Sequence, residues 1–277
     1  MPRFIYGTAW KGDSTARFVG NALEVGFRGF DTANQLLHYH ESHVGIAIST
    51  AITAGLVQRS DLYLQSKFTF PQYQDTRLPY DPNATTSDQV EQSFASSLVH
   101  LGTETLDAYL LHAPAKKLGL TDDDVAAWRA MEVIHDSGQV SSLGICNVSA
   151  EQLALLCKVA RIQPRVVQNR FCAVRGWDRS VRDMCSARNI VYQGFSVLTG
   201  LSMLTTKREK AILAELARMA ELNGRPMSQI MFRFALELGV FPITGSTCSD
   251  HMQLNLASLE FSLARDDVQA LEVLAAQ

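Results

Sequence analysis

Short apolar runs and longer amphipathic segments alternate along the whole chain. Eight runs rich in β-branched and aromatic residues have the length of strands and lie at 3–8, 27–32, 62–68, 106–112, 140–147, 165–171, 190–196 and 240–246. Between them, apolar residues recur at helical spacing in segments 14–26, 89–102, 122–138, 149–160, 178–189 and 207–224. Strands that alternate with helices indicate βα units around a parallel sheet. Eight such units predict an α/β fold of the (β/α)8 TIM-barrel type.

Residues at the segment boundaries support several of these helices. Thr121 and Ser149 precede segments with acids in the first turn, as N-caps do, and Gly138 and Gly224 are suitable helix stops. Two segments depart from simple alternation: an irregular stretch at 70–88 and an additional helical pattern at 227–239. Because barrel enzymes carry their chemistry on the loops that follow the strands, we expect 70–88 to lie on the active-site side.

The composition restricts the class of partner. The chain has 277 residues, 47% of them hydrophobic, which suffices for one large core, so we expect a single domain over 1–277. The net charge is −3, and acidic and basic residues are interspersed. This distribution favours neither nucleic acid nor a membrane surface as a partner. We expect a small-molecule substrate and favour a monomer, although the sequence leaves the oligomeric state open.

Cysteine usage and the N-terminus indicate the compartment. The five cysteines are widely spaced, without a CxxC pair or a nearby Cys/His cluster of metal-ligand spacing. We expect reduced thiols and predict no metal site. The N-terminus lacks a charged region followed by an apolar stretch, and no apolar run approaches the ~20 residues that span a bilayer. These features predict a cytoplasmic protein.

Polar residues close the apolar runs at the ends where barrel enzymes place their active sites. They are Thr8, Asp31, Lys67, His112, Asn147, Gln168, Ser196 and Ser246. A single polar residue at a strand end is commonly a cap or a turn residue. Asp31, Lys67 and His112, however, end three consecutive strands, and three titratable groups at one cavity mouth indicate a functional site.

Motifs around these strand ends resemble those of a known family. They are "GFRGFDTA", "ESHVGIAI", "LYLQSKF", "LDAYLLHAP", "LGICNVSAEQL", "PRVVQNRF", "GFSVL" and "GSTCSDHMQLNL". Their order along nearly the whole chain is similar to that of the aldo-keto reductase superfamily. The resemblance implies one (β/α)8 barrel domain that binds NADP(H) or NAD(H) and reduces aldehydes or ketones to alcohols, and hence an NAD(P)-dependent oxidoreductase.

The family's catalytic tetrad corresponds to Asp31, Tyr39, Lys67 and His112. Carbonyl reduction leaves negative charge on oxygen, and Tyr39 is the expected proton donor. Lys67 would favour loss of that proton by stabilising the phenolate, and Asp31 would keep Lys67 charged. His112 would donate a hydrogen bond to the carbonyl oxygen.

The tyrosine of this chain has an unusual spacing. In most of the superfamily the tyrosine follows the aspartate by five positions, whereas Tyr39 follows Asp31 by eight and precedes Glu41 by two. A less studied branch shares the form "DTAxQxxHY". The neighbouring His38 and His40 have no family role, and we expect them to be loop residues.

The resemblance also implies the nicotinamide end of a cofactor site. Thr8 and Trp10 correspond to positions beside the ribose, Asn147 and Gln168 to the amides that hold the carboxamide, and Phe195 to the ring stacked on the nicotinamide. Ser196 and Leu198 correspond to positions along the pyrophosphate. Cys146, next to Asn147, stands where the family usually has a serine. The sequence favours neither a cofactor contact nor simple apolar packing for this cysteine.

The adenine end departs from the family. Gly245 and His251 stand where NADP-binding members carry a lysine and an arginine, while Ser246 and Asn255 are retained. Loss of two cations should weaken binding of the additional phosphate. Thr247, Ser246 and the following helix start could still hold a phosphate. The family favours NADP(H) over NAD(H), and the sequence leaves the choice open.

The sequence says less about the residues that contact the substrate. The sequence ends with "FSLARDDVQALEVLAAQ", which predicts a more open cavity than in relatives with a longer C-terminal loop. Aromatic residues that could line it or pack locally are Trp10, Phe68, Phe70, Tyr73, Tyr80 and Trp177. Two alternatives to a reductase remain: a regulatory barrel that binds nucleotide without turnover, and a lyase or isomerase without hydride transfer.

Overall fold

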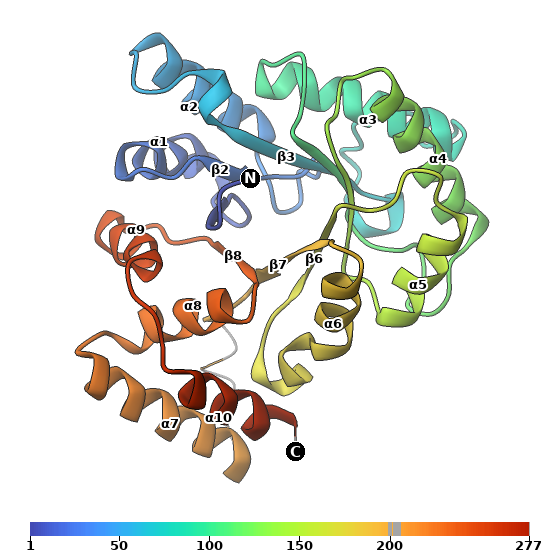
Figure 1. Ribbon diagram of the computed structural model, residues 1–277. Helices are drawn as coiled ribbons and strands as arrows, with labels where there is room; N and C mark the ends of the chain where they lie inside the picture. Colours follow the sequence, from blue (N-terminus) through green and yellow to red (C-terminus); the bar gives the residue numbers. More distant parts are fainter. Residues whose placement is uncertain (199–200, 202–205, 277) are drawn as a thin grey trace.

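Eight parallel strands form a closed barrel in a computed structural model that describes residues 1–198, 201 and 206–276 (Figure 1). The strands pair in sequence order, and β8 closes the barrel by pairing with β1. Their bounds are β1 Ile5–Gly7, β2 Gly29–Asp31, β3 Tyr63–Phe68, β4 Ala108–Leu111, β5 Leu143–Cys146, β6 Val166–Arg170, β7 Val191–Phe195 and β8 Phe241–Thr244. The predicted (β/α)8 fold is therefore confirmed, with strands somewhat shorter than the apolar runs.

Helices surround the barrel. They are α1 Thr15–Val25, α2 Glu41–Thr53, α3 Thr86–Leu101, α4 Asp122–Asp136, α5 Ala150–Val159, α6 Arg179–Ala187, α7 Lys207–Asn223, α8 Met227–Glu237, α9 Ser249–Leu256 and α10 Arg265–Ala276. Short 3-10 segments include η1 Gly12–Ser14, η2 Arg59–Asp61, η3 Pro71–Tyr73, η4 Ala173–Asp178 and η6 Ala257–Leu259. All predicted helices are present, including the additional one at 227–239, which is α8.

The predicted helix boundaries are also confirmed. The hydroxyl groups of Thr121 and Ser149 accept backbone N–H bonds at the starts of α4 and α5. Gly138 and Gly224 follow the ends of α4 and α7 with positive φ angles, which glycine adopts without strain. The irregular stretch 70–88 contains η3 and leads from β3 into α3 on the side where the strands end, as expected.

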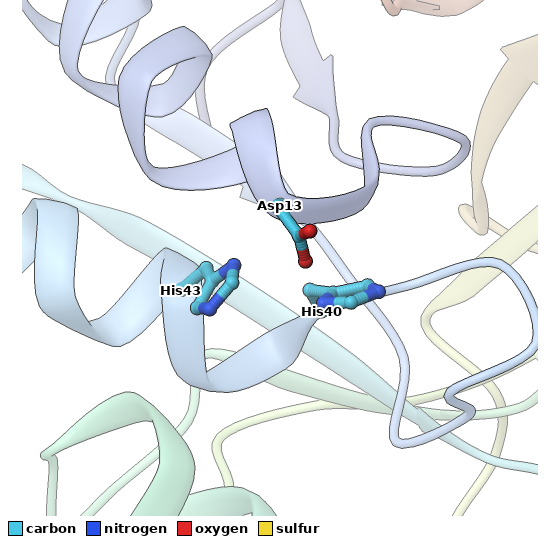
Figure 2. A group of neighbouring side chains, drawn as sticks. All are labelled: Asp13, His40 and His43. Carbon is cyan, nitrogen blue, oxygen red and sulfur yellow. The ribbon is translucent and has the colours of Figure 1, made fainter.

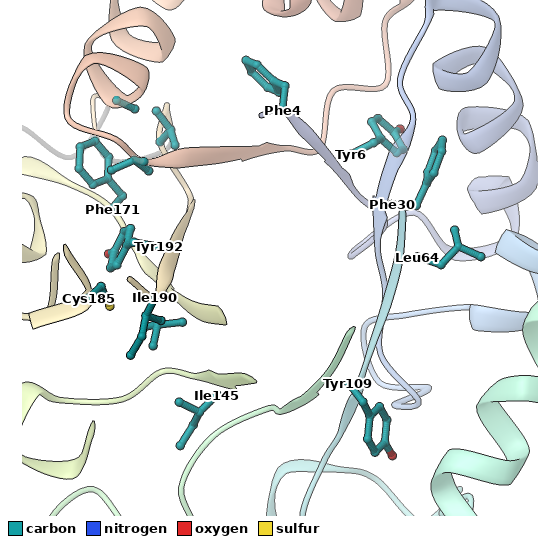
Figure 3. Packing of buried hydrophobic residues seen from close by; sticks show 14 of the residues in the cluster. Phe4, Tyr6, Phe30, Leu64, Tyr109, Ile145, Phe171, Cys185, Ile190 and Tyr192 are labelled. Atoms are coloured by element: carbon teal, nitrogen blue, oxygen red, sulfur yellow. The ribbon is translucent and has the colours of Figure 1, made fainter. Parts of the chain in front are cut away.

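Strand residues alternate between two environments. Side chains such as Tyr6, Phe30, Leu64 and Tyr109 point away from the barrel centre and pack in the main core against the helices (Figure 3). The alternate positions face the interior. A smaller apolar cluster occupies them: Ile5, Tyr63, Ala108, Leu110, Cys146, Val166 and Ile243.

The interior positions change from apolar to polar toward the C-terminal strand ends. In β3 the inward residues run Tyr63, Gln65, Lys67, and in β6 they run Val166, Gln168. The interior therefore has an apolar lower layer and a polar upper layer. This alternation places Lys67 and Asp31 together inside the barrel mouth.

All five cysteines are free thiols, as expected, and Cys146, Cys172 and Cys185 are buried. Among the described residues, the helices are too short or too polar to span a membrane.

Candidate active site

A cavity of about 880 Å³ opens at the C-terminal ends of the strands. Most residues predicted for catalysis or cofactor binding line it: Trp10, Asp31, Tyr39, His112, Asn147, Gln168, Phe195, Ser196, Leu198, Gly245, Ser246, Thr247, His251 and Asn255. Thr8, Lys67 and Cys146 are fully buried and lie outside this lining. The structure thus brings together positions that are up to 245 residues apart in sequence (Trp10 to Asn255).

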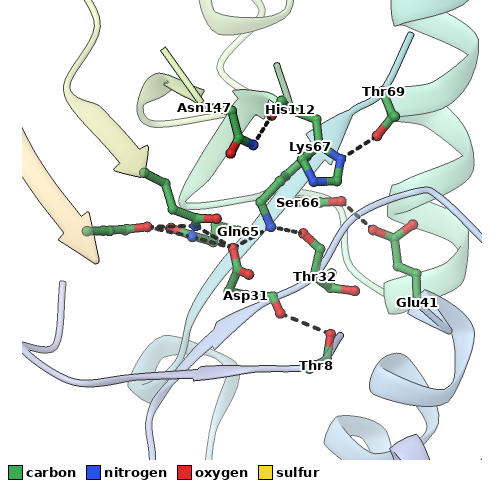
Figure 4. A network of polar contacts seen from close by, with 12 residues as sticks. Thr8, Asp31, Thr32, Glu41, Gln65, Ser66, Lys67, Thr69, His112 and Asn147 are labelled. Carbon is green, nitrogen blue, oxygen red and sulfur yellow. Dashed lines mark hydrogen bonds and ion pairs between the residues drawn. The ribbon is translucent and has the colours of Figure 1, made fainter. Parts of the chain in front are cut away.

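The floor of the cavity holds a buried ion pair (Figure 4). The ammonium of Lys67 donates to Oδ1 of Asp31 at 2.6 Å and to the carbonyl oxygen of Thr32 at 2.8 Å. Burial by itself would lower the pKa of Lys67, but the Asp31 carboxylate, together with Tyr39 and Cys146, raises the pKa. Lys67 is therefore a permanent cation at the base of the site.

A layer of glutamines fixes the carboxylate of Asp31. The amide groups of Gln65 and Gln168 donate to the same Oδ1 at 2.6 and 2.8 Å. Gln193 accepts from both of these amides, at 2.8 and 3.0 Å. Gln168, predicted as a carboxamide partner, thus has an amide already engaged with Asp31, and Gln65 and Gln193 are site residues that the motifs did not indicate.

Tyr39 lies above this ion pair in the loop between β2 and α2. Its ring centroid is 5.0 Å from Nζ of Lys67, and the side chain is only 9% exposed. Burial raises the pKa of Tyr39 to about 12, and Lys67 opposes that rise. Despite the altered spacing in sequence, the tyrosine reaches the lysine and the aspartate.

His112 forms the other wall of the same corner. Its ring makes an edge contact with Tyr39, with centroids 5.8 Å apart, and its Nδ1 is 2.7 Å from the hydroxyl oxygen of Thr69. Burial, together with Lys67 and His38, holds the pKa of His112 well below its ordinary value. The ring is therefore neutral at neutral pH.

The residue after the tyrosine loop anchors α2 to the barrel. Glu41, the first residue of α2, is buried, accepts a hydrogen bond from Ser66 of β3, and its other oxygen is 3.2 Å from Nδ1 of His100. The Glu41 hydrogen bond raises the pKa of His100. Since Tyr39 precedes Glu41 by two residues, this contact fixes one end of the loop that carries Tyr39.

One cationic side chain of the cavity was not predicted from the sequence. Lys11, in the loop after β1, lines the cavity and is 8% exposed, and its ammonium donates to the carbonyl oxygen of Gly245 at 2.9 Å. Burial lowers the pKa of Lys11 to about 8. A Cβ at Gly245 would lie 3.3 Å from this ammonium. The glycine that replaces the family's lysine therefore leaves room for Lys11.

A second cation lies near the ring expected to stack on the nicotinamide. The guanidinium of Arg170 lies 5.2 Å from the centroid of Phe195, and both residues line the cavity. Ser196, which follows β7, and Asn147, which follows β5, have positive φ angles of 58° and 54°. Such backbone strain in non-glycine residues is characteristic of functional sites.

The aromatic residues considered for the substrate side separate into two groups. Trp10 lines the cavity and is 74% exposed. Phe68, Phe70 and Tyr80 are buried in mutual contacts outside it. Trp177 is 2% exposed and stacks on Phe171. It therefore packs in the core as part of an aromatic cluster. Tyr73, in η3, hydrogen-bonds the carbonyl oxygen of Pro114 and does not line the cavity.

A closed barrel with titratable groups at the C-terminal strand ends defines the class of (β/α)8-barrel enzymes. Within that class, the chain belongs to the aldo/keto reductase family, whose family model matches residues 5–276. It is accordingly an NAD(P)-dependent oxidoreductase that acts on carbonyl compounds.

Individual relatives agree with this assignment. Deoxymugineic acid synthase 1 of Oryza sativa subsp. japonica is 29% identical over 98% of this chain and 86% of its own. The NAD(P)H-dependent D-xylose reductase of Pachysolen tannophilus is 27% identical over 95% of this chain and 86% of its own. The solved structure of an aldo/keto reductase from Brucella melitensis superposes with a TM-score of 0.81 at 25% identity, covering 99% of this chain and 95% of that one.

Proposed function

We propose that Tyr39 donates the proton when this enzyme reduces an aldehyde or ketone to an alcohol. The observation that carries the proposal is the position of Tyr39 between the Lys67–Asp31 ion pair and His112, on the wall of the cavity. When a reduced nicotinamide nucleotide is bound in this cavity, it supplies the hydride that the carbonyl carbon accepts. The oxygen of the carbonyl then needs a proton and a fixed hydrogen-bond donor.

Lys67 and Asp31 prepare Tyr39 for this step. Burial alone would make the tyrosine a very weak acid, because it disfavours the phenolate. The ammonium of Lys67 stabilises the phenolate left after proton transfer, and Asp31 keeps that ammonium charged. The proton therefore leaves Tyr39 most readily when negative charge develops on the substrate oxygen beside it.

His112 acts as the neutral hydrogen-bond donor. If the hydroxyl of Thr69 donates to Nδ1, the neutral imidazole carries its proton on Nε2. That proton would orient the carbonyl oxygen toward Tyr39. The low pKa of His112 supports a neutral ring, because burial and a nearby Lys67 make a charged imidazolium unfavourable.

The cavity fits a nucleotide of the NAD(P) class. Phe195 offers a face for the nicotinamide ring, Asn147 and Gln168 offer amide oxygens, and Lys11 and Arg170 offer cations for phosphate oxygens. Lys11 supplies a charge near the position where Gly245 and His251 depart from the family pattern. We infer that NADP(H) is preferred over NAD(H), and that residues 1–277 act as a single domain.

A nucleotide titration combined with a turnover assay tests the proposal. We expect NADPH to quench the fluorescence of Trp10, and the complex to oxidise NADPH when aromatic and aliphatic aldehydes are added. Binding without turnover over a broad aldehyde and ketone panel would favour the regulatory barrel. Binding of neither NADPH nor NADH would contradict the reductase and favour a lyase or isomerase.

A further inference from the structure

Three side chains with metal-ligating atoms converge beside the catalytic loop, outside the lining of the cavity. Asp13 lies in η1, His40 is the N-cap residue of α2, and His43 lies in the first turn of that helix. One ligand atom from each residue lies within 4.8 Å of the other two. Figure 2 shows the carboxylate and both rings facing the same space between η1 and the start of α2.

These side chains have no competing partners among the residues that the structure describes. None of the hydrogen bonds or ion pairs found there involves the carboxylate of Asp13 or the imidazoles of His40 and His43. Nδ1 of His43 is shielded from solvent and has no hydrogen-bond partner. A shielded imidazole nitrogen without a partner is costly unless something binds it.

The spacing suits a small cation after a slight contraction. A tetrahedral zinc ion with bonds of about 2.0–2.2 Å places its ligand atoms about 3.4 Å apart. The ligand atoms here lie within 4.8 Å of one another, so rotations that move each group by about 1 Å would suffice. Asp13 is exposed and the histidines are half-buried, which leaves the side chains room for such rotations.

The backbone already brings the two loops together. The N–H of Trp10 donates to the carbonyl oxygen of His38 at 2.7 Å, and the rings of these residues stack with centroids 3.7 Å apart. The N–H of His43 donates to the carbonyl oxygen of His40 at 3.0 Å, which holds the two histidines on one turn. An ion between Asp13 and these histidines would extend an existing contact between the loops.

We propose that Asp13, His40 and His43 bind a divalent transition-metal ion, with zinc as the best match, and that this ion clamps the loop after β1 to the loop that carries Tyr39. Two imidazoles and a carboxylate suit zinc or its neighbours, whereas magnesium and calcium prefer oxygen ligands. Water completes the coordination. We expected no metal site from the sequence, because Asp13 is 27 residues from His40 and only the fold joins them.

The ion has a structural role, and its binding does not depend on the proposed reduction. His40 directly follows Tyr39, so the ion would restrict the backbone beside the proton donor. Binding and thermal stability are therefore the readouts, and they remain informative if Tyr39 proves not to be the acid.

Calorimetric titration of the metal-free full-length protein with zinc chloride tests the proposal, with cobalt(II) absorption as a second probe. We expect one zinc per chain and an increase in Tm upon zinc addition. His40→Ala and His43→Ala should each weaken zinc binding by more than about 100-fold, because even indirect partners of metal ligands contribute about 10–100-fold. Without zinc, both variants should keep the Tm of the unsubstituted protein.

The matched control is His135→Ala, which removes a histidine at the end of α4 on a different part of the barrel. It should bind zinc as the unsubstituted protein does. The proposal is overturned if the protein binds no zinc below millimolar concentration, or if His40→Ala and His43→Ala retain full affinity. Loss of affinity in His251→Ala alone would also overturn it, because the ion would then lie in the nucleotide cavity. If one variant fails to fold, Asp13→Asn replaces it.

Discussion

Oδ1 of Asp31 accepts three hydrogen bonds, from Lys67, Gln65 and Gln168. A buried carboxylate is stable only when such donors compensate for the water it has lost. The same oxygen therefore holds the ammonium that the proposed role of Tyr39 requires and connects it to the glutamine layer. At the scale of single residues, the site depends on this one carboxylate for its electrostatics.

Lys11 offers a direct test of the cofactor assignment. Replacing Lys11 by Met removes the cation beside Gly245, and a charge-assisted contact to phosphate contributes about 1.5–3 kcal/mol. We expect the Kd for NADPH to increase about 10- to 100-fold. Because the pKa of Lys11 is about 8, the affinity of the unsubstituted protein should also fall as the pH rises through about 8.

The control for Lys11 is Lys117→Met, an exposed lysine outside the cavity lining. Its affinity for NADPH, and the dependence of that affinity on pH, should match those of the unsubstituted protein. Fluorescence titrations at about pH 7 and about pH 9 measure both effects. An unchanged Kd in Lys11→Met would remove Lys11 from the cofactor site.

Sequence reasoning identified residues whose position follows from a rule. Asp31, Lys67 and His112 end strands, and barrels place strand ends at the active site. Lys11 and Asp13 lie in the connection after β1, and their partners at Gly245, His40 and His43 are distant in sequence. No periodicity indicates such contacts, because pairing of β1 with β8 brings Lys11 to Gly245 and pairing of β1 with β2 brings Asp13 to the two histidines.

At the scale of elements, hydrophobic period predicted all eight strands but did not assign α2, α9 or α10. α2 was recognised only as part of a motif because Ile46 and Ile52 are exposed, so the helix lacks a clean polar face. Trp177 was left open between lining the cavity and packing locally, and it packs locally. An aromatic residue in a loop resembles a substrate contact in sequence, whereas its ring fills a gap beside Phe171 and Phe234.

Close packing of α2 against α3 depends on Gly45. A Cβ at this position would lie 2.0 Å from the carbonyl oxygen of His100 and 2.9 Å from Cα of Leu101. Gly45→Ala should therefore destabilise the protein by about 1–3 kcal/mol, although alanine is the better helix former. Urea denaturation measures this change.

Gly20, in α1, provides the matched control. A Cβ there meets no atom within 4 Å, so Gly20→Ala should stabilise the protein by about 0.5–1 kcal/mol through helix propensity alone. If the two alanine variants changed stability in the same direction, the close approach of α2 and α3 at Gly45 would be in doubt.

At the scale of the whole molecule, the buried neutral state of His112 links stability to pH. Its pKa is lowered in the folded protein, so the unfolded chain binds a proton more readily below about pH 6.5. The contribution of His112 to the free energy of unfolding is present above the pKa that the imidazole has in the unfolded chain. It is lost as the pH falls toward the lower pKa that the imidazole has in the folded protein. Between about pH 7.5 and 5.5, His112→Gln should therefore lose about 1 kcal/mol less stability than the unsubstituted protein.

Comparison of His112→Gln with the unsubstituted protein removes the contributions of all other titratable groups that the two proteins share. The raised pKa of His100 acts in the opposite direction, and lowered pKa values of Glu132 and Glu237 act at lower pH. Denaturation curves at both pH values yield the difference. Parallel losses of stability in the two proteins would mean that His112 is protonated as easily in the folded state as in the unfolded chain.

The most direct test of the account is the single-turnover rate of NADPH oxidation by an aromatic aldehyde in Tyr39→Phe. Removal of a general acid should reduce this rate about 100- to 10,000-fold while the Kd for NADPH changes by less than about threefold. Tyr73→Phe, which removes a hydroxyl outside the cavity lining, should retain the rate of the unsubstituted protein. A Tyr39→Phe variant that oxidised bound NADPH at the unsubstituted rate would contradict the assignment of Tyr39 as the proton donor.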